Sequence, residues 1–505
     1  MLIDFAITNY KSIKGTVHLD IVYNTTKTNE ELDKDCNCDN YIDFFKAPIG
    51  NNAGRINVCP VMALFGANAS GKSNILKAFL ALRAIVLNGY TENFYTPFKF
   101  SSETENAPTK FEITFSNDSE ENPCIYKYGI EYSADKIERE YLLKIGKTED
   151  STIFDTDDFD TIPKDMWQLF ITRHRPCASI FFDEKYNGSN VSKELKEGFE
   201  DVKEFFNKLI IADDINLSPI SVPTDEDDYK EKQLVFNTVK NWLLRMDMNF
   251  YDIDAKGNII NYAEENEEVS KFSFDHIEDI EKYKRILETK YPEELVTFEV
   301  IGDSYEFKKY NINMKYAKDG FTYKNGKDNT VPVNYVKDES TGTKNLFRFL
   351  FVLIDALQHG KIIIFDEIDR TIHTELLNFI FGVIQATNLN KHGAQMICSS
   401  HNPCIIETVG EQGTVFVKKM GDLSTRVDFL SEYSKNIPNY LSTLVNRLSE
   451  EYTKKETGDL STIIDRLSEY TKHEKNVLKD YLNGRFGAIP HVRDVLETME
   501  VPNAI

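Results

Sequence analysis

The chain has 505 residues, a length that suits about three domains, each with its own core. Its 59 basic and 82 acidic residues give a formal net charge of −23, which excludes a generally basic surface; DNA or RNA could bind only in a local basic groove. The seven cysteines form no CxxC pair, which predicts reduced thiols and a cytoplasmic location. With no export signal and no membrane-spanning run, we expect no membrane contact.

The N-terminal region is predicted to be rich in antiparallel strands. Residues 2–7 and 16–22 alternate apolar and polar positions, which predicts paired strands around a turn. Polar residues 24–56 are interpreted as a surface excursion. Later alternating segments, separated by Asn and Asp turn residues, indicate an antiparallel meander at residues 110–115, 124–131 and 137–143.

The segment GANASGKSN at 66–74 fits the phosphate-binding loop pattern. It follows an apolar run typical of a buried strand, 61–65, and precedes apolar residues at helical spacing, 74–87. Backbone N–H groups and the positive helix end would then converge on phosphate oxygens, Lys72 would bind the β/γ-phosphates, and Ser73 would bind Mg²⁺. The predicted nucleotide contacts are Gly66, Asn68, Ser70, Gly71, Lys72, Ser73 and Asn74.

Residues 147–325 have a different character. Acidic stretches separate two amphipathic helical patterns, at 195–209 and 235–246, so we interpret a mainly helical insertion with solvated acidic loops. Strand-like segments resume near residue 294. Beyond residue 431 the chain is predicted to be helical, with a short internal duplication of the sequence RLSE(E)YTK.

A second cluster of chemically important residues follows the apolar run KIIIFD at 361–366. Such a run predicts a central parallel strand, which places Asp366 and Glu367 at its carboxyl end, where α/β sheets carry their sites. Asp366 is the expected second ligand of Mg²⁺. Glu367 is positioned to act as general base on an attacking water.

Two further segments would complete a nucleotide site. The apolar strand 395–400 ends at His401, which could sense the γ-phosphate if a crossover helix at 371–385 makes this strand parallel to the carboxylate strand. The segment DESTGTK at 338–344 precedes an apolar helix, and Ser340, Gly342 and the free N–H groups of that helix form a second anion-binding surface.

These motifs resemble, in order, the Walker A, signature, Walker B with D-loop, and switch histidine segments of ABC-type ATPases. They are GANASGKSN, ESTGTKNL, IIIFDEIDRTIHTELL and SSHNP. The group that they resemble is the SMC-like one, which contains the RecF, OLD, RloA and AbiL proteins. The opening NYKSIKG looks like the N-terminal strand and turn of that group, and the later YLNGRFGAIP is similar to the tail of its RloA and AbiL branch. The signature segment departs from the usual pattern, since it reads ESTGT in place of LSGGQ.

The resemblance implies an α/β fold: an ABC-type P-loop ATPase head with a mainly parallel core sheet, an antiparallel β-subdomain, a helical insertion and a helical C-terminal tail. The corresponding domains are an ATPase lobe I with Walker A and the β-subdomain, the insertion, an ATPase lobe II with signature, Walker B and switch histidine, and the C-terminal region, at 1–146, 147–325, 326–430 and 431–505.

The resemblance also implies how the site would be completed. Ser340 and Gly342 of one protomer would close over the nucleotide bound to the other, so ATP and Mg²⁺ are the expected ligands of an ATP-dependent homodimer or higher homo-oligomer. The catalytic residues would be Lys72, Glu367 and His401. The remaining residues placed by the resemblance lie in the D-loop (Asp369 and His373) or near the adenine (Tyr10 and Lys11).

The preferred functional hypothesis is an ATP-hydrolysing, nucleotide-driven dimerising switch or sensor in prokaryotic phage defence, working with a separately encoded effector protein. A RecF-like DNA-repair ATPase is the alternative, and would need a basic face, for instance around Arg173 and Arg175. An OLD-type nuclease ranks lower, because no DxD pair follows His401. An effector within the insertion could use Asp155 and Asp157, and a transporter ATPase subunit is disfavoured by the NYKS opening and the long insertion.

Overall fold

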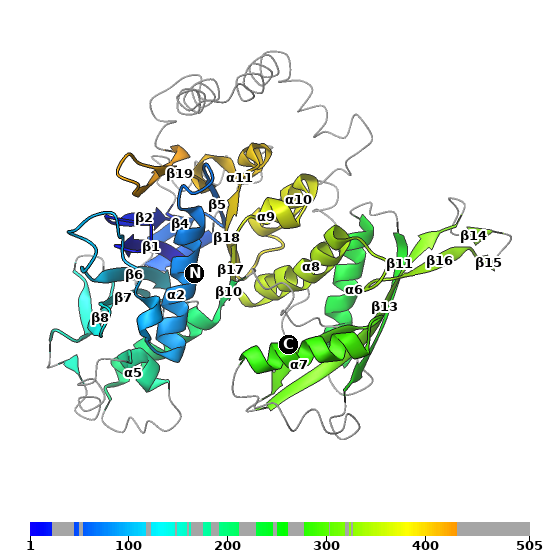
Figure 1. Ribbon diagram of the computed structural model, residues 1–505, viewed down its shortest axis with the longest axis horizontal. Coiled ribbons are helices and arrows are strands. Elements are labelled where there is room, and N and C mark those ends of the chain that lie inside the picture. The colour runs from blue at the N-terminus through cyan, green and yellow to red at the C-terminus, as the bar shows by residue number, and fades with distance from the viewer. Residues whose placement is uncertain are drawn as a thin grey trace, which may run out of the picture. The chain divides into compact units, whose positions relative to one another are not determined.

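The computed structural model forms two compact units (Figure 1). The first contains Met1–Ile211, Gly360–Asp369 and Leu377–Val492, and the second contains Ala212–His359, Arg370–Leu376 and Arg493–Ile505. The structure describes residues 1–22, 45–49, 54–117, 123–146, 149–158, 161–162, 175–182, 191–211, 229–245, 250–260, 277–301, 304–318, 323–324 and 327–431. The predicted helical region 432–505 and its short duplication therefore lie outside the described residues.

The first unit is organised around a six-stranded core sheet with the order β10-β17-β18-β5-β19-β20. The first five strands run parallel to their neighbours, and β20 is antiparallel to β19. Strands β5, β17 and β18 are buried along their whole length, because a parallel sheet covered on both faces admits few polar side chains. The strands are β10 (Leu209–Ile211), β17 (Ile362–Phe365), β18 (Gln395–Ser400), β5 (Val61–Phe65), β19 (Thr414–Lys419) and β20 (Thr425–Phe429).

A second six-stranded sheet in the first unit is antiparallel, with the order β2-β1-β6-β7-β8-β9. It contains the predicted N-terminal strand pair and the predicted meander, and β9 extends it by one strand. The strands are β1 (Leu2–Thr8), β2 (Val17–Asp20), β6 (Thr109–Ser116), β7 (Ile125–Tyr132), β8 (Ile137–Lys144) and β9 (Ser151–Asp155). A separate hairpin, β3 (Phe45–Ile49) with β4 (Gly54–Val58), lies in the predicted surface excursion.

Helix α2 (Lys72–Asn88) contacts both sheets of the first unit, as Figure 1 shows. Phe79 of α2 packs on Phe5 of β1 with ring centroids 4.1 Å apart, and α2 also contacts β18. One apolar cluster joins side chains of both sheets with α2 and α5 (Lys193–Asn207). The phosphate loop, which joins β5 to α2, therefore begins and ends in elements of this core. The shorter helices are η1 (Glu92–Phe94), α4 (Cys177–Phe181), α9 (Ile368–Thr371), α10 (Thr374–Gln385), η5 (Pro403–Ile405) and α11 (Ile406–Gly413).

The second unit combines helices with a four-stranded antiparallel sheet. The 14-residue strand β13 is its centre: β11 pairs along one edge, and β12 and β16 share the other. Helix α7 packs through Tyr283 on Phe307 of β13, and α6 contacts α8. The elements are α6 (Tyr229–Arg245), β11 (Phe250–Ile259), α7 (Ile277–Lys290), β12 (Leu295–Ile301), β13 (Ser304–Ala317), β14 (Tyr323–Lys324), β15 (Lys327–Asp328), β16 (Thr330–Asn334) and α8 (Thr341–His359).

The interval 147–325 contains more strand than its acidic sequence suggested. Both predicted helical patterns form helices, α5 and α6, but β9 and β10 extend the two sheets of the first unit and β11 to β13 build the sheet of the second. Polar and apolar residues alternate along parts of β11 and β13, such as 252–254 and 311–315, so this sheet resembles a solvated loop in composition. The boundary between the two compact units falls after Ile211, whereas the sequence suggested a boundary at 146/147.

Candidate nucleotide-binding site

The phosphate loop has two positions, Gly66 and Gly71, at which a side chain would not fit. Gly71 has φ +113° and Ala69 has φ +61°, both in the left-handed region that favours glycine. A Cβ atom at Gly66 would lie 2.2 Å from the carbonyl oxygen of Val417, and one at Gly71 would lie 2.1 Å from Oγ1 of Thr425. The loop is therefore built against β19 and β20 as well as against its own helix.

Lys72 lies across this loop. Its side chain is 5% exposed, and Nζ donates hydrogen bonds to the carbonyl oxygens of Gly66 at 2.7 Å and Ala67 at 3.2 Å. Burial lowers the pKa of the ammonium group, while the nearby carboxylates of Asp366, Glu367 and Asp369 act in the opposite direction. The structure thus brings the predicted cation of the loop into the field of the predicted carboxylates.

The loop also contains an unsatisfied buried hydroxyl. Ser70 is 2% exposed, and its Oγ has no hydrogen-bond partner among the described residues. Such an orphan is uncommon in a folded interior, and it fits a site whose remaining partner is a phosphate oxygen. Ser73 is half-buried at the second position of α2, and Asn68 is exposed on the loop.

The two predicted carboxylates follow β17, and a serine from β18 holds them. The parallel register pairs Phe365 with Cys398, so the loops after both strands begin side by side. Oγ of Ser399 donates a 2.5 Å hydrogen bond to Oδ1 of Asp366 and accepts a 2.7 Å bond from the N–H of Glu367. Ser399 belongs to the SSHNP segment of the sequence, in which nothing local indicates this role.

His401 lies beside the predicted general base. Its Nε2 is 3.9 Å from Oε1 of Glu367, with both side chains about one-third exposed. The N–H of His401 donates to both carboxylate oxygens of Asp369, each at 3.2 Å. Lys72, Asp366, Glu367 and His401 are therefore brought together at the carboxyl edge of strands β5, β17 and β18.

A chain of polar contacts supports the phosphate loop from behind. Asn74, predicted to contact the nucleotide, donates through Nδ2 to Oγ of Ser12 at 2.7 Å. Ser12 Oγ lies 2.7 Å from Oγ1 of Thr425, which donates to the carbonyl of Ser70 at 2.9 Å. Ser12 and Thr425 were not predicted, and local sequence carries no signal for them, because the contacts join segments more than 340 residues apart.

The other residues placed by resemblance have distinct environments. Ser340 lies in the second unit, where its Oγ accepts from the N–H of Thr343 at 3.1 Å and thereby caps α8. Gly342 is exposed, and a Cβ there would meet only Oγ of Ser340 at 3.9 Å, which is an ordinary contact. Tyr10 is 4% exposed and packs in the apolar cluster of the first unit, and Lys11 lies 5.6 Å above its ring.

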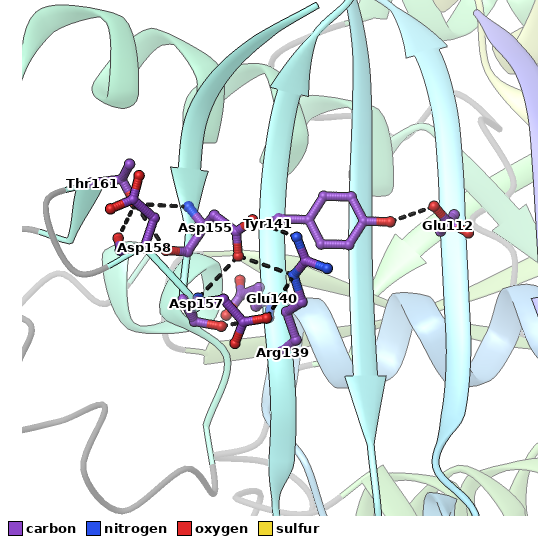
Figure 2. A network of polar contacts seen from close by, with 9 residues as sticks. Glu112, Arg139, Glu140, Tyr141, Asp155, Asp157, Asp158 and Thr161 are labelled. Atoms are coloured by element: carbon purple, nitrogen blue, oxygen red, sulfur yellow. Dashed lines mark hydrogen bonds and ion pairs between the residues drawn. The ribbon is translucent and has the colours of Figure 1, made fainter.

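The carboxylates considered for a second effector site have structural partners instead. Figure 2 shows Arg139 of β8 bound to Asp155, with Nε–Oδ1 and Nη2–Oδ2 distances of 3.0 and 2.6 Å, and within 3.3 Å of Asp157. Over the described ranges, no group of three or more His, Cys, Asp or Glu could hold a metal ion. Arg173 lies outside the described residues, and Arg175 bonds to Ser179 within its own segment.

Phosphate loop, buried lysine and paired carboxylates at one edge of a parallel sheet define a phosphate-loop nucleotide-binding protein of the ATPase class. Residues 61–407 match the family described as "AAA domain, putative AbiEii toxin, Type IV TA system", and the chain belongs to that family. This membership agrees with the ATPase part of the expected resemblance, while the RloA and AbiL branch stays a prediction. In the part of the chain that the structure describes, no helix has the length and apolar character to cross a membrane.

Several solved structures of SMC heads are similar to this chain. An SMC head bound to the C-terminal winged-helix domain of ScpA shares 12% identity with a TM-score of 0.41, covering 86% of this chain and 99% of that one. The SMC head domain from Thermotoga maritima shares 12% identity with a TM-score of 0.36, covering 85% of this chain and 98% of that one. The Smc head domain from Pyrococcus furiosus, bound to the C-terminal domain of ScpA, shares 13% identity with a TM-score of 0.37, covering 86% of this chain and 98% of that one. No curated protein has a significantly similar sequence.

Proposed function

We propose that this chain is an ATPase that converts ATP and water to ADP and phosphate in the presence of Mg²⁺. The observation that supports it best is that Lys72 follows β5 while Asp366 and Glu367, almost 300 positions later in the chain, follow β17, so all three lie at the carboxyl edge of one parallel sheet. Lys72 is bound to carbonyl groups of its own loop, this loop also contains the orphan hydroxyl of Ser70, and burial lowers the pKa of the ammonium group against the opposing effect of three carboxylates. This combination suits a triphosphate–metal ligand.

The residues of this site divide the work of phosphoryl transfer. Lys72 and the N–H groups of the loop bind and orient the β- and γ-phosphates. Ser73 and Asp366 would hold Mg²⁺, which when bound neutralises charge on the phosphate oxygens. Glu367 accepts a proton from the attacking water, and His401, 3.9 Å away, keeps that water and the γ-phosphate in line.

A mutant pair tests this assignment. Lys72→Ala should lose binding of a fluorescent ATP analogue, whereas Glu367→Gln should keep binding and lose phosphate release by a factor of about a hundred or more. EDTA should stop phosphate release by the wild type. An active Glu367→Gln protein, or Lys72→Ala that binds ATP as well as wild type, would overturn the assignment. Ser116→Ala, at a buried hydroxyl in β6 away from the site, serves as the matched control.

We further propose that ATP drives dimerisation of the head. Ser340 and Gly342 support this: both are exposed, and the space around Gly342 is open, so its lack of a side chain is not explained by packing within its own protomer. A glycine at the start of α8 would let a phosphate approach the backbone N–H groups there. Size-exclusion chromatography with light scattering should then show an ATP-dependent dimer.

The biological setting we propose is prokaryotic phage defence with a separately encoded effector. The supporting feature is the motif resemblance to the RloA and AbiL branch. The full chain carrying Glu367→Gln should stay bound to ATP. Affinity purification of this variant from its host in the presence of ATP should retain the product of a neighbouring gene. Retention of DNA in its place, lost as salt is raised, would favour the DNA-repair alternative.

A further inference from the structure

We propose that Ser399 is a positioning residue that sets the orientation of both Asp366 and Glu367, and that hydrolysis and Mg²⁺ binding depend on its hydroxyl. This inference rests on the proposed ATPase function. Ser399 would touch neither nucleotide nor water. It acts through the two carboxylate residues after β17.

The hydroxyl of Ser399 bonds to both of these neighbours. Ser399 is 0% exposed, so water does not compete for its bonds. Its single proton goes to Oδ1 of Asp366 at 2.5 Å, and its oxygen accepts the N–H of Glu367 at 2.7 Å. A bond from a hydroxyl to an ionised carboxylate is among the stronger protein hydrogen bonds. One rotatable side chain thereby fixes a carboxylate and the following backbone together.

The backbone of Glu367 needs such a restraint. Its φ is +51°, in the left-handed region that a residue with a Cβ rarely adopts. A strained conformation of this kind persists only where its surroundings hold it. The bond from the N–H of Glu367 to Ser399 does so directly, and this backbone angle decides where the side chain of the predicted general base points.

A second contact joins the segments that follow β17 and β18. The N–H of His401, just after β18, donates to both carboxylate oxygens of Asp369 in α9. Asp366 and Asp369, on either side of Glu367, are thus bound to Ser399 and His401 respectively. Ser399 is the buried member of this pair of attachments, whereas Asp369 and His401 are partly exposed. Loss of the Ser399 hydroxyl should therefore disturb geometry without removing any charged group of the site.

The test compares Ser399→Ala, Ser399→Cys and Ser399→Thr with wild type in the full chain. Ser399→Ala should lower kcat by about 10- to 100-fold and raise the Mg²⁺ concentration for half-maximal rate by about tenfold, the usual effect of removing a partner of a metal ligand. The affinity for a fluorescent ATP analogue without Mg²⁺ should not change, but its tightening on adding Mg²⁺ should shrink. The nearly isosteric cysteine should be intermediate, and threonine, which keeps the hydroxyl, should restore most of the rate.

Several outcomes would overturn the proposal. Ser399→Ala with wild-type kcat and Mg²⁺ dependence would show that the hydroxyl does not position the carboxylates. A lower melting temperature with an unchanged Mg²⁺ midpoint, in either the alanine or the cysteine variant, would assign Ser399 a structural role only. If wild type itself neither binds nor hydrolyses ATP, the proposed function fails, and that result is distinct from a failure confined to the Ser399 variants.

Discussion

Thr425→Val should weaken ATP binding by interrupting the polar chain behind the phosphate loop. The direction of this chain follows from proton counting, because each hydroxyl has one proton to donate. Thr425 gives its proton to the carbonyl of Ser70, so Ser12 must donate to Thr425, and Ser12 accepts in turn from Asn74. The chain therefore runs from α2 through the N-terminal turn and β20 back to the loop, and bonds aligned in this way strengthen one another.

The size of the effect can be worked from these contacts. Valine has nearly the shape of threonine but cannot make either hydrogen bond, at 2.9 Å to Ser70 and 2.7 Å to Ser12. Each bond contributes about 0.5–1.5 kcal/mol net, so the two together contribute about 1–3 kcal/mol. Thr425 is only 6% exposed, so water cannot readily replace them. At about 1.4 kcal/mol per factor of ten, ATP affinity should fall by about 5- to 150-fold if the loss falls on the loop.

Equilibrium titration of a fluorescent ATP analogue measures this directly, with urea unfolding of each variant in parallel. Thr425→Ser, which keeps the hydroxyl and loses a methyl group, is the matched control and should bind within about threefold of wild type, a difference below about 0.7 kcal/mol. If Thr425→Val binds ATP like wild type while its unfolding free energy falls, the chain stabilises the fold without shaping the loop. That result would refute the reasoning.

Three further predictions concern separate parts of the molecule. Glu367→Gln should accumulate as an ATP-bound dimer in size-exclusion chromatography, and a protein that stays monomeric in saturating ATP would count against the switch. Gly342→Arg should have a free energy of unfolding within about 0.5 kcal/mol of wild type, because position 342 is exposed and the space around it is open. The same variant should form no ATP-dependent dimer, and normal dimerisation would place the interface elsewhere. Gly129→Ala should lower the unfolding free energy by about 1–3 kcal/mol, because its Cβ would meet Tyr141 Cζ at 2.1 Å; unchanged urea unfolding would contradict this.

The same Gly129 position explains a feature of the antiparallel sheet. The ring of Tyr141 lies across the glycine on the neighbouring strand and its hydroxyl donates to Glu112 on the strand beyond, as Figure 2 shows. Arg139 stacks on the same ring at 4.9 Å. An aromatic side chain thus covers the gap that a strand glycine leaves, which permits a glycine in the interior of a six-stranded sheet.

Local sequence was sufficient to predict the elements that carry the candidate site. Apolar runs with no polar interruption predicted β5, β17 and β18, and the glycine pattern predicted a loop whose backbone rules out a side chain at Gly66 and Gly71. The strand predictions are strong because their physical cause is local: burial on both faces needs consecutive apolar residues. Gly71 is also favoured locally, by its φ of +113°, whereas the close approach of Val417 to Gly66 is a tertiary contact. The same reasoning placed Asp366 and Glu367 at the end of a parallel strand.

The sheet of the second unit was harder to predict, since charged residues are frequent along its strands. Along β13, Lys309 and Lys315 are about one-quarter exposed and pair with acidic residues next to β12 and on β11, at 3.4 Å to Glu294 and 2.6 Å to Asp254. In the sequence alone, these lysines and their neighbours form a polar run that resembles a loop. Only the antiparallel register supplies the partners that make the run a sheet face.

The sequence by itself determined which residues could do chemistry: a cation on a glycine loop, two carboxylates after a buried strand, and a histidine after the next. The tertiary structure alone decided how they are held. Ser399 meets Asp366 and Glu367, and Thr425 meets Ser70, because parallel neighbours and a distant hairpin bring their ends together. A side chain's hydrogen-bond partner depends on strand order and register, and no periodicity within one segment encodes a contact between segments hundreds of residues apart.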